Sequence, residues 1–311
     1  MQIVLNLVLP FFAVIALGIL AVRTKLLGDS AVQPINIFVF YFTMPALLAG
    51  TLAKQDFAAL INVSFMSAWL VAALVIYLLG MAVSRVFFKA NLKEMALSGQ
   101  ASAIGNVGFL GFPLMFASFG DEGLLIASTA IFIDLIIFMP ITLCILEAAG
   151  GGTLSQSWKR ILKGAFVNPF IIAILLGTLL SAGGWNLDGP IERFLSFLGG
   201  AAAPAALFAI GVSLGGRKVE GDVAAISTLT FLKLFAHPLA ALIVFWLFGV
   251  EGEILAIGLV LAAIPIAGNV FVIAQQYDSM VRRCSSAILV STALAIVTIA
   301  IVLNWAGVTS V

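Results

Sequence analysis

The stretch AAIPIAGNVFVIAQQY, residues 262–277, places a Pro, a Gly and an Asn inside a segment that is otherwise apolar enough to cross a membrane. An earlier segment carries a related pattern, because IGNV at 104–107 matches AGNV at 267–270. Gly and Pro both disfavour the interior of a helix. Both segments are therefore predicted to contain a break, and the meaning of the breaks depends on the surrounding solvent.

The composition indicates that this solvent is a lipid bilayer. Of 311 residues, 63% are hydrophobic and 9% are charged, whereas soluble domains carry roughly a quarter charged residues. The net charge of +1 argues against a polybasic surface and against nucleic-acid binding. The first apolar segment begins at Ile3 with no basic residue before it, so it is expected to be a retained helix rather than a secretory signal.

Apolar runs of about 20 residues, the length that crosses the hydrocarbon core, predict ten transmembrane helices. Lys and Arg in the connecting loops are divided twelve to two between the two sides, with Lys54 and Arg193 forming the minority. The basic side is expected to be cytoplasmic. Both termini then lie on the outer side of a bacterial-type cytoplasmic (inner) membrane. The predicted spans are 3–22, 32–51, 64–88, 95–118, 123–147, 166–183, 191–215, 223–248, 253–275 and 284–305.

The two halves of the chain resemble each other. LPFFAVIALGIL at 9–20 aligns with NPFIIAILLGTL at 168–179, and Pro45 aligns with Pro204 at the same offset. The GNV pair follows at an offset that is only slightly larger. Five helices per half is an odd number, so the second copy enters the membrane from the opposite side, as in an inverted repeat.

The repeat defines the expected domain organisation. Residues 1–147 and 166–311 are predicted to form the two five-helix repeats. Between them, residues 148–165 form a cytoplasmic linker in which Trp158, Ile161 and Leu162 alternate with basic residues. This pattern is typical of an interfacial helix, with a partner-docking helix as the alternative.

These residues resemble the auxin efflux carrier family, which includes plant PIN carriers and bacterial malonate-type permeases, over essentially the whole chain. The resemblance implies an all-α polytopic fold in which helices 1, 2, 6 and 7 form a scaffold and helices 3–5 and 8–10 a mobile domain. It also implies that the broken helices 4 and 9 cross near the membrane centre and bind an organic anion. One departure is that Pro265 precedes Asn269 by four residues, whereas Ser102 stands at the corresponding place before Asn106.

Physical chemistry points to the same two breaks. Backbone groups freed inside a bilayer are tolerated only where protein, water or a ligand meets them, and a helix N-terminus favours a carboxylate. Asn106 and Asn269 are the predicted substrate contacts, and Gly105 and Gly268 would let the backbone approach closely. The alternative is that these residues serve helix packing; their repetition in inverted copies favours a site. The expected helix-breaking prolines are Pro45, Pro204 and Pro265.

Several other polar residues are secondary candidates for the substrate site. Hydrogen bonds between helices are the favoured explanation for them, and substrate contact is the second. This set comprises Thr43, Ser213, Gln100, Gln275 and Gln276.

Three ionisable residues are expected at membrane depth. Asp134 lies in IFIDLIIF, while Lys233 and His237 lie in FLKLFAHP, four residues apart and so on one helix face. Such groups face cavities, pair with each other or carry protons. An Asp134–Lys233 pair is predicted either as a structural tie or as a proton-coupling element. The alternatives are a packing role for His237 beside Pro238 and a Lys233 side chain that reaches the cytoplasmic surface.

The leading hypothesis is a secondary transporter that moves a small carboxylate or dicarboxylate by alternating access at the crossing of helices 4 and 9. The alternative is a cation/proton antiporter that uses Asp134 and Lys233. An intramembrane enzyme is disfavoured because the chain carries a single His and no HExxH motif. Cys144 and Cys284 have no metal-type spacing and are expected to be packing residues. No cofactor or metal is expected; the expected partners are the organic anion, a proton or sodium ion and the lipid bilayer, with a homodimer left open.

Overall fold

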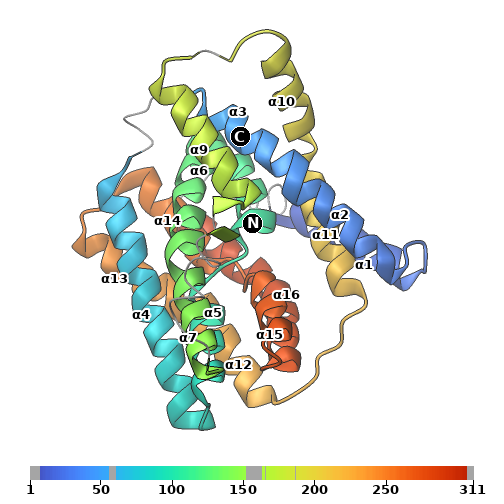
Figure 1. Cartoon of the computed structure of the whole chain (residues 1–311), viewed down its shortest axis with the longest axis vertical. Helices are drawn as coiled ribbons and strands as arrows, with labels where there is room; N and C mark the ends of the chain where they lie inside the picture. Colours follow the sequence, from blue (N-terminus) through green and yellow to red (C-terminus); the bar gives the residue numbers. More distant parts are fainter. Residues whose placement is uncertain (1–7, 56–60, 152–162, 165, 186, 307–311) are drawn as a thin grey trace.

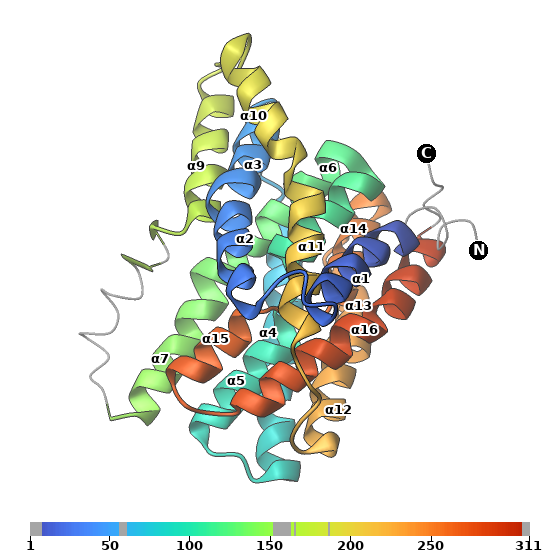
Figure 2. The same cartoon turned by 90° about the vertical axis from the view of Figure 1, so that its right-hand side faces the viewer.

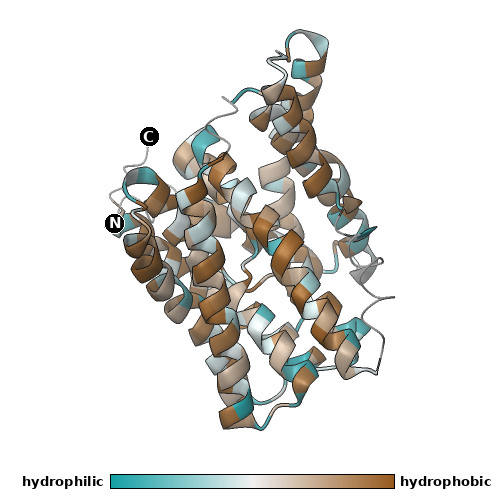
Figure 3. Ribbon diagram, turned by 60° about the vertical axis from the view of Figure 1, so that its left-hand side comes forward, coloured by the Kyte–Doolittle hydropathy of each residue, from teal (hydrophilic) through white to brown (hydrophobic). Residues whose placement is uncertain are grey.

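The computed structural model describes residues 8–55, 61–151, 163–164, 166–185 and 187–306. Throughout these ranges the chain forms helices and turns, and its only β-type pairing is an isolated bridge. Figure 3 shows hydrophobic residues along the helices and most hydrophilic residues near helix ends and turns. The fold is therefore that of a polytopic all-helical membrane protein. The linker helix expected around Trp158 lies outside the described residues.

Six helical stretches in the described ranges are long and apolar enough to cross a bilayer. Five of them match predicted apolar ranges within a few residues, whereas Val107–Ala149 covers the second half of the predicted span 95–118 together with 123–147. Three shorter apolar helices accompany them: Leu9–Arg23, Pro169–Ala182 and Gly252–Ala263. The six are Val32–Leu52, Val63–Phe88, Val107–Ala149, Pro190–Gly215, Val223–Leu247 and Val281–Trp305.

The first half of the chain runs from α1 to α7. Its third span is the single helix α4, Val63–Phe88. The N-cap residue Asn62 accepts a hydrogen bond on its side chain from the amide of Phe65. The other elements are shorter pieces of spans: α1 (Leu9–Arg23), α2 (Val32–Phe38), η3 (Val39–Thr43), α3 (Met44–Leu52), α5 (Leu92–Ala103), η4 (Val107–Gly111), α6 (Phe112–Ile133), η5 (Asp134–Phe138) and α7 (Met139–Ala149).

The stretch Val107–Ala149 is too long for one span and reverses direction inside α6. Its 43 residues would extend about 65 Å as one straight helix, roughly twice the hydrocarbon thickness. Gly120 has a φ of 58° and ψ of −140°, a left-handed conformation that glycine adopts at no steric cost. Beyond it, Gly123 packs directly against the backbone carbonyl of Met115. The reversal lies between the predicted spans 95–118 and 123–147.

The second half runs from α9 to α16. The N-terminus of α9 is capped by Asn168, whose side chain accepts from the amide of Phe170, and Pro169 takes the first helical position. The elements are α9 (Pro169–Ala182), α10 (Pro190–Gly200), α11 (Ala202–Gly215), α12 (Val223–Phe231), η6 (Leu232–Ala236), α13 (His237–Leu247), α14 (Gly252–Ala263), α15 (Asn269–Gln276) and α16 (Val281–Trp305).

The helices pack in two groups. In the scaffold group, α1 packs against α11 and α3 packs against α9 and α10 (Figures 1 and 2). In the crossing group, α4 packs on α5 and α13, while α12, α14 and α15 pack on α16. The two groups meet mainly where α6 and η4 contact α11, α3 and α9.

Small residues allow the closest helix contacts in the scaffold group. A Cβ atom added to Gly18 of α1 would lie 2.9 Å from the Cα of Gly211 in α11. A Cβ added to Gly177 of α9 would lie 2.8 Å from the Cβ of Leu52 in α3. The alignment of the two halves places Gly177 over Gly18 and, at the same offset, Gly211 over Leu52. Residues aligned between the two halves thus make corresponding contacts.

A wide helical turn precedes each of four prolines. Each turn is a five-residue π-helix, η3, η4, η5 or η6, whose last residue is followed two positions later by Pro45, Pro113, Pro140 or Pro238. Proline has no N–H and crowds the preceding turn. The residue just before each proline donates its amide five residues back instead. Such turns frequently occur at functional sites, and here they contain Thr43, Asp134 and Lys233.

Candidate functional site

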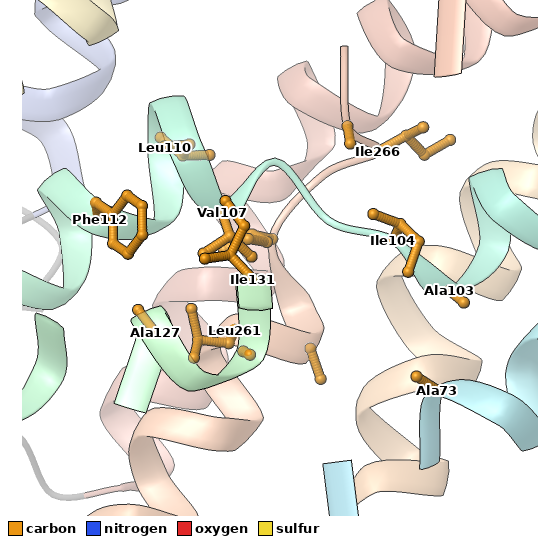
Figure 4. Packing of buried hydrophobic residues seen from close by; sticks show 14 of the residues in the cluster. Ala73, Ala103, Ile104, Val107, Leu110, Phe112, Ala127, Ile131, Leu261 and Ile266 are labelled. Atoms are coloured by element: carbon orange, nitrogen blue, oxygen red, sulfur yellow. The ribbon is translucent and has the colours of Figure 1, made fainter. Parts of the chain in front are cut away.

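The two broken helices meet and pair through their backbones. Helix α5 ends at Ala103 and α14 ends at Ala263, and each is followed by a short extended segment. Gly105 and Ile266 form an antiparallel bridge, flanked by hydrogen bonds from the amide of Asn106 to the carbonyl of Pro265 (2.9 Å) and from the amide of Ala267 to the carbonyl of Ile104 (3.2 Å). Figure 4 shows the segment from Ile104 to Val107 beside the segment that carries Ile266.

The first break is closed by local contacts. Asn106 is the N-cap of η4: its side chain accepts from the amide of Phe109 at 3.3 Å, and its carbonyl accepts from the amides of Leu110 and Gly111. Ser102, where the second copy suggested a proline, is still helical and donates its hydroxyl to the carbonyl of Ser98. In the paired backbones the residue opposite Pro265 is Asn106, not Ser102. The first break therefore forms without a proline.

The second break is closed by side chains from other helices. The Nζ atom of Lys233 donates to the carbonyl of Ala262 at 2.5 Å, and the hydroxyl of Thr298 donates to the carbonyl of Ala263 at 3.2 Å. These carbonyls form the C-terminus of α14, where a positive charge is electrostatically favoured. The hydroxyl of Ser291 accepts from the amide of Ile266. Polar groups freed by this break are therefore matched from η6 and α16.

The N-terminus of α15 is left with unused hydrogen-bonding groups. Gly268 is its N-cap and supplies no side chain. Across the described part of the chain, the amides of Gly268 and Asn269 have no acceptor, and the buried Oδ1 of Asn269 has no partner. Gly268 is exposed, and a Cβ atom added there would meet nothing within 4 Å. Open space thus adjoins Gly268, at the helix end where two amides and the buried carboxamide oxygen of Asn269 have no partner.

Lys233, His237, Trp69 and Asp134 form a buried polar cluster in the crossing group. Lys233 and His237 are fully buried, and their Nζ and Nδ1 atoms are 3.0 Å apart. A charged ammonium only donates, so Nδ1 accepts and a neutral ring carries its proton on Nε2. That Nε2 has no partner. The reading in which Lys233 extends to the cytoplasmic surface is wrong, because the side chain turns inward to α14.

Asp134 completes the cluster through an aromatic residue. Its Oδ1 accepts from the indole Nε1 of Trp69 at 3.2 Å, whereas its Oδ2 is buried without a hydrogen-bond partner. The Trp69 ring lies 5.7 Å from the His237 ring, centroid to centroid. Asp134 and Lys233 are close enough for their charges to interact, but in the described ranges no ion pair within 4.0 Å joins them.

The other predicted residues are spread over both helix groups. Thr43 is buried and donates to the carbonyl of Val39 within its own helix. Gln100 is buried and ends a chain in which Tyr77 donates to Thr142 (2.8 Å) and Thr142 donates to the Gln100 Oε1 (2.7 Å). Gln275 and Gln276 are exposed at the end of α15. Pro45 is the second residue of α3 and Pro204 the third residue of α11, so both stand in the first turn of a helix.

Ser213 accepts hydrogen bonds from Arg217, a residue that the sequence pattern indicated only as a positive charge in a loop. Arg217 donates from Nε to the carbonyl of Ser213 (3.0 Å), from Nη2 to the Ser213 hydroxyl (3.4 Å) and from Nη1 to the Ser285 hydroxyl (3.3 Å). Its guanidinium carbon lies 4.3 Å from the centroid of the Phe271 ring in α15. The four-residue spacing of Ser213 and Arg217 was the sequence feature that could have predicted this contact. Trp69, an indole N–H donor in an apolar helix, was the signal for the partner of Asp134.

Comparison with known proteins agrees with a helical membrane protein. The family model described as "Membrane transport protein" matches residues 3–303. The chain belongs to that family. Its members carry small molecules across membranes, so the protein is a membrane transporter rather than an enzyme, and the resemblance to auxin efflux carriers is confirmed.

Relatives from bacteria and archaea match over nearly the full length. A Rhizobium meliloti protein named "Putative malonate transporter" is 29% identical over 297 residues, covering 94% of this chain and 93% of its own. An uncharacterized transporter of Methanothermobacter thermautotrophicus is 28% identical, with coverage of 94% and 95%. The uncharacterized transporter YfdV of Escherichia coli K12 is 25% identical, with 91% of each chain covered. The shared length includes both breaks.

Proposed function

We propose that the protein is a secondary transporter that binds a small organic anion, a carboxylate or dicarboxylate, at the crossing and moves it by alternating access. The single observation that carries this proposal is the N-terminus of α15, where two amides and the Asn269 carboxamide have unused capacity beside open space. Unpaired amides at a helix N-terminus attract an anion. The name of the Rhizobium relative supports a dicarboxylate such as malonate.

The roles of the two asparagines differ in this proposal. Asn269 contacts the substrate directly: its amide N–H groups suit a carboxylate oxygen, and its Oδ1 suits the O–H of water or of a protonated carboxyl. Asn106 already caps η4 through its side-chain oxygen, so it shapes the site and offers only its remaining N–H donors. Gly105 lets the two broken segments approach closely, and Gly268 leaves open space for the substrate.

The proposed movement follows from the two helix groups. An inverted pair of five-helix repeats, 1–147 and 166–311, is supported by the corresponding contacts of Gly18 with Gly211 and of Gly177 with Leu52. In such folds one group rocks against the other around a site at the membrane midplane. We place both termini on the outer side of a bacterial-type inner membrane, because Lys and Arg gather in the alternate loops.

Coupling to an ion is assigned to the buried cluster. Asp134 keeps one carboxyl oxygen free of hydrogen bonds, and Lys233 holds the end of α14 directly beside the crossing. A proton taken up by Asp134 would change the charge that acts on Lys233, and hence the stability of the broken helix. His237 links Lys233 to the ring of Trp69 and completes the connection.

The test is transport by purified protein in liposomes. Labelled malonate is offered with and without a pH gradient or a sodium gradient, and Asn269→Ala is compared with the wild type. We expect Asn269→Ala to lower kcat/KM at least about tenfold, while Asn304→Ala, at an exposed position on α16, leaves it unchanged. Normal malonate transport by Asn269→Ala would falsify the proposed site. Sodium or proton exchange without any carboxylate flux would favour the cation/proton antiporter instead.

A further inference from the structure

Arg217 occupies an unusual position between the two helix groups. It follows α11 of the scaffold group, is half-buried, and contacts Phe271 of α15 and Ser285 of α16 in the crossing group. Its hydrogen-bond partners are a backbone carbonyl and two serine hydroxyls. No carboxylate of the described ranges lies within 4.0 Å of it, and the nearby carboxylate of Asp222 lies 3.9 Å from Arg283 instead. The guanidinium thus lacks a counter-ion.

The charge of Arg217 adds to the positive end of α15. Phe271 belongs to the first turn of that helix, the same turn as Asn269. Burial lowers the pKa of Arg217 below its usual value, yet an arginine side chain stays protonated in proteins. A cation is unfavourable near a helix N-terminus, where the dipole is already positive. An anion between the two would remove this repulsion.

One face of α15 connects Arg217 with the open space at the crossing. Gly268 and Phe271 are three residues apart, and Gln275 follows Phe271 by four, so the three share a face. Open space lies beside Gly268, Arg217 covers Phe271, and Gln275 is exposed at the far end. On the scaffold side Arg217 is held by Ser213. A small anion on this face would meet the free amides at one end and the guanidinium at the other.

We propose that Arg217 binds the second carboxylate of a dicarboxylate whose first carboxylate lies at the N-terminus of α15, and so selects dicarboxylates over monocarboxylates. The inference rests on the proposed function and deepens it. A guanidinium binds a carboxylate through two parallel hydrogen bonds. Its present partners, a backbone carbonyl, two hydroxyls and a ring face, are all neutral, so a carboxylate would be the first charged partner of the guanidinium.

The test compares malonate with acetate as probes on the full-length protein. Transport in liposomes and the ligand-induced rise in Tm are measured for the wild type, Arg217→Gln, Arg217→Lys and the neighbouring control Lys218→Gln. We expect Arg217→Gln to raise the KM for malonate at least about tenfold while that for acetate changes less than about twofold. Arg217→Lys, which keeps the charge but loses the paired donors, should fall between, and Lys218→Gln should match the wild type.

Two results would overturn the assignment. An unchanged malonate-to-acetate ratio in both Arg217 variants shows that the residue does not read the second carboxylate. An equal loss for malonate and acetate, with a lowered Tm in the absence of ligand, shows a purely structural tie between α11 and α15. Either result leaves the Asn269 test untouched, because that test concerns the first carboxylate.

Discussion

The amide of Asn106 donates to the carbonyl of Pro265 across the crossing, 2.9 Å away. This bond joins two helix breaks that are far apart in the sequence and makes each a partner of the other. Each extended segment provides hydrogen-bond partners for backbone groups of the other. Backbone groups at membrane depth need such partners. Groups that keep no hydrogen-bond partner within the described ranges lie at the N-terminus of α15.

Asn106 and Asn269 are predicted to contribute differently to the stability of the protein. Asn106→Ala removes the cap of η4 and should lower the free energy of unfolding by about 1 kcal/mol, whereas Asn269→Ala removes an acceptor without a partner and should cost little. Thermal unfolding of both variants in detergent checks this. A larger loss of Tm for Asn269→Ala than for Asn106→Ala contradicts the assigned roles.

The glycines of the two breaks are predicted to respond oppositely to alanine. A Cβ at Gly105 would lie 2.6 Å from the Cγ1 of Ile264 and 3.3 Å from the Cε of Lys233, so Gly105→Ala should lower the Tm. Gly268 has helical dihedral angles and open space, so Gly268→Ala should raise the free energy of unfolding by roughly 0.4–1 kcal/mol.

The same Gly268→Ala variant also tests the substrate site. If an anion approaches the backbone there, the added methyl group should weaken malonate uptake in a protein that is more stable than the wild type. Uptake and Tm measured on one preparation separate the two effects. A variant that is both more stable and fully active indicates that the substrate does not touch Gly268.

Asp134→Asn is predicted to uncouple transport without unfolding the protein. The Asn oxygen can still accept from Trp69 Nε1, so the Tm should stay within a few degrees of the wild type. Uptake driven by a pH gradient should be lost, while exchange of labelled for unlabelled substrate continues. Asp121→Asn, at an exposed position beside the Gly120 reversal, is the control. If gradient-driven uptake persists in Asp134→Asn, the cluster is a structural tie.

The scaffold contact of α1 with α11 is predicted to tolerate no larger residue. A Cβ at Gly211 would overlap the carbonyl oxygen of Ile15, so Gly211→Ala should cost about 1–3 kcal/mol by forcing the helices apart. Gly200→Ala, where a Cβ meets nothing within 4 Å, serves as the matched control. Equal Tm values for the two variants would contradict the close packing described here.

Local sequence was sufficient to predict both breaks but not their register. The alignment of IGNV with AGNV places Gly105 over Gly268, whereas the paired backbones join Gly105 to Ile266, two positions earlier. The aligned asparagines consequently take different positions: Asn106 precedes its helical segment as a cap, while Asn269 is the first residue of α15. Register depends on contacts between distant segments, which no local pattern encodes.

By itself the sequence determined that the chain lies in a membrane, where its apolar spans begin and end, and that two of them are broken. These properties follow from composition and from short-range chemistry, because a segment crosses the hydrocarbon core only if it is long and apolar enough, whichever helices it packs against. Only the tertiary structure decided that Lys233 caps α14, that Trp69 holds Asp134, and that Arg217 contacts the first turn of α15. Each of those contacts joins different helices, so it exists only once the helices have packed.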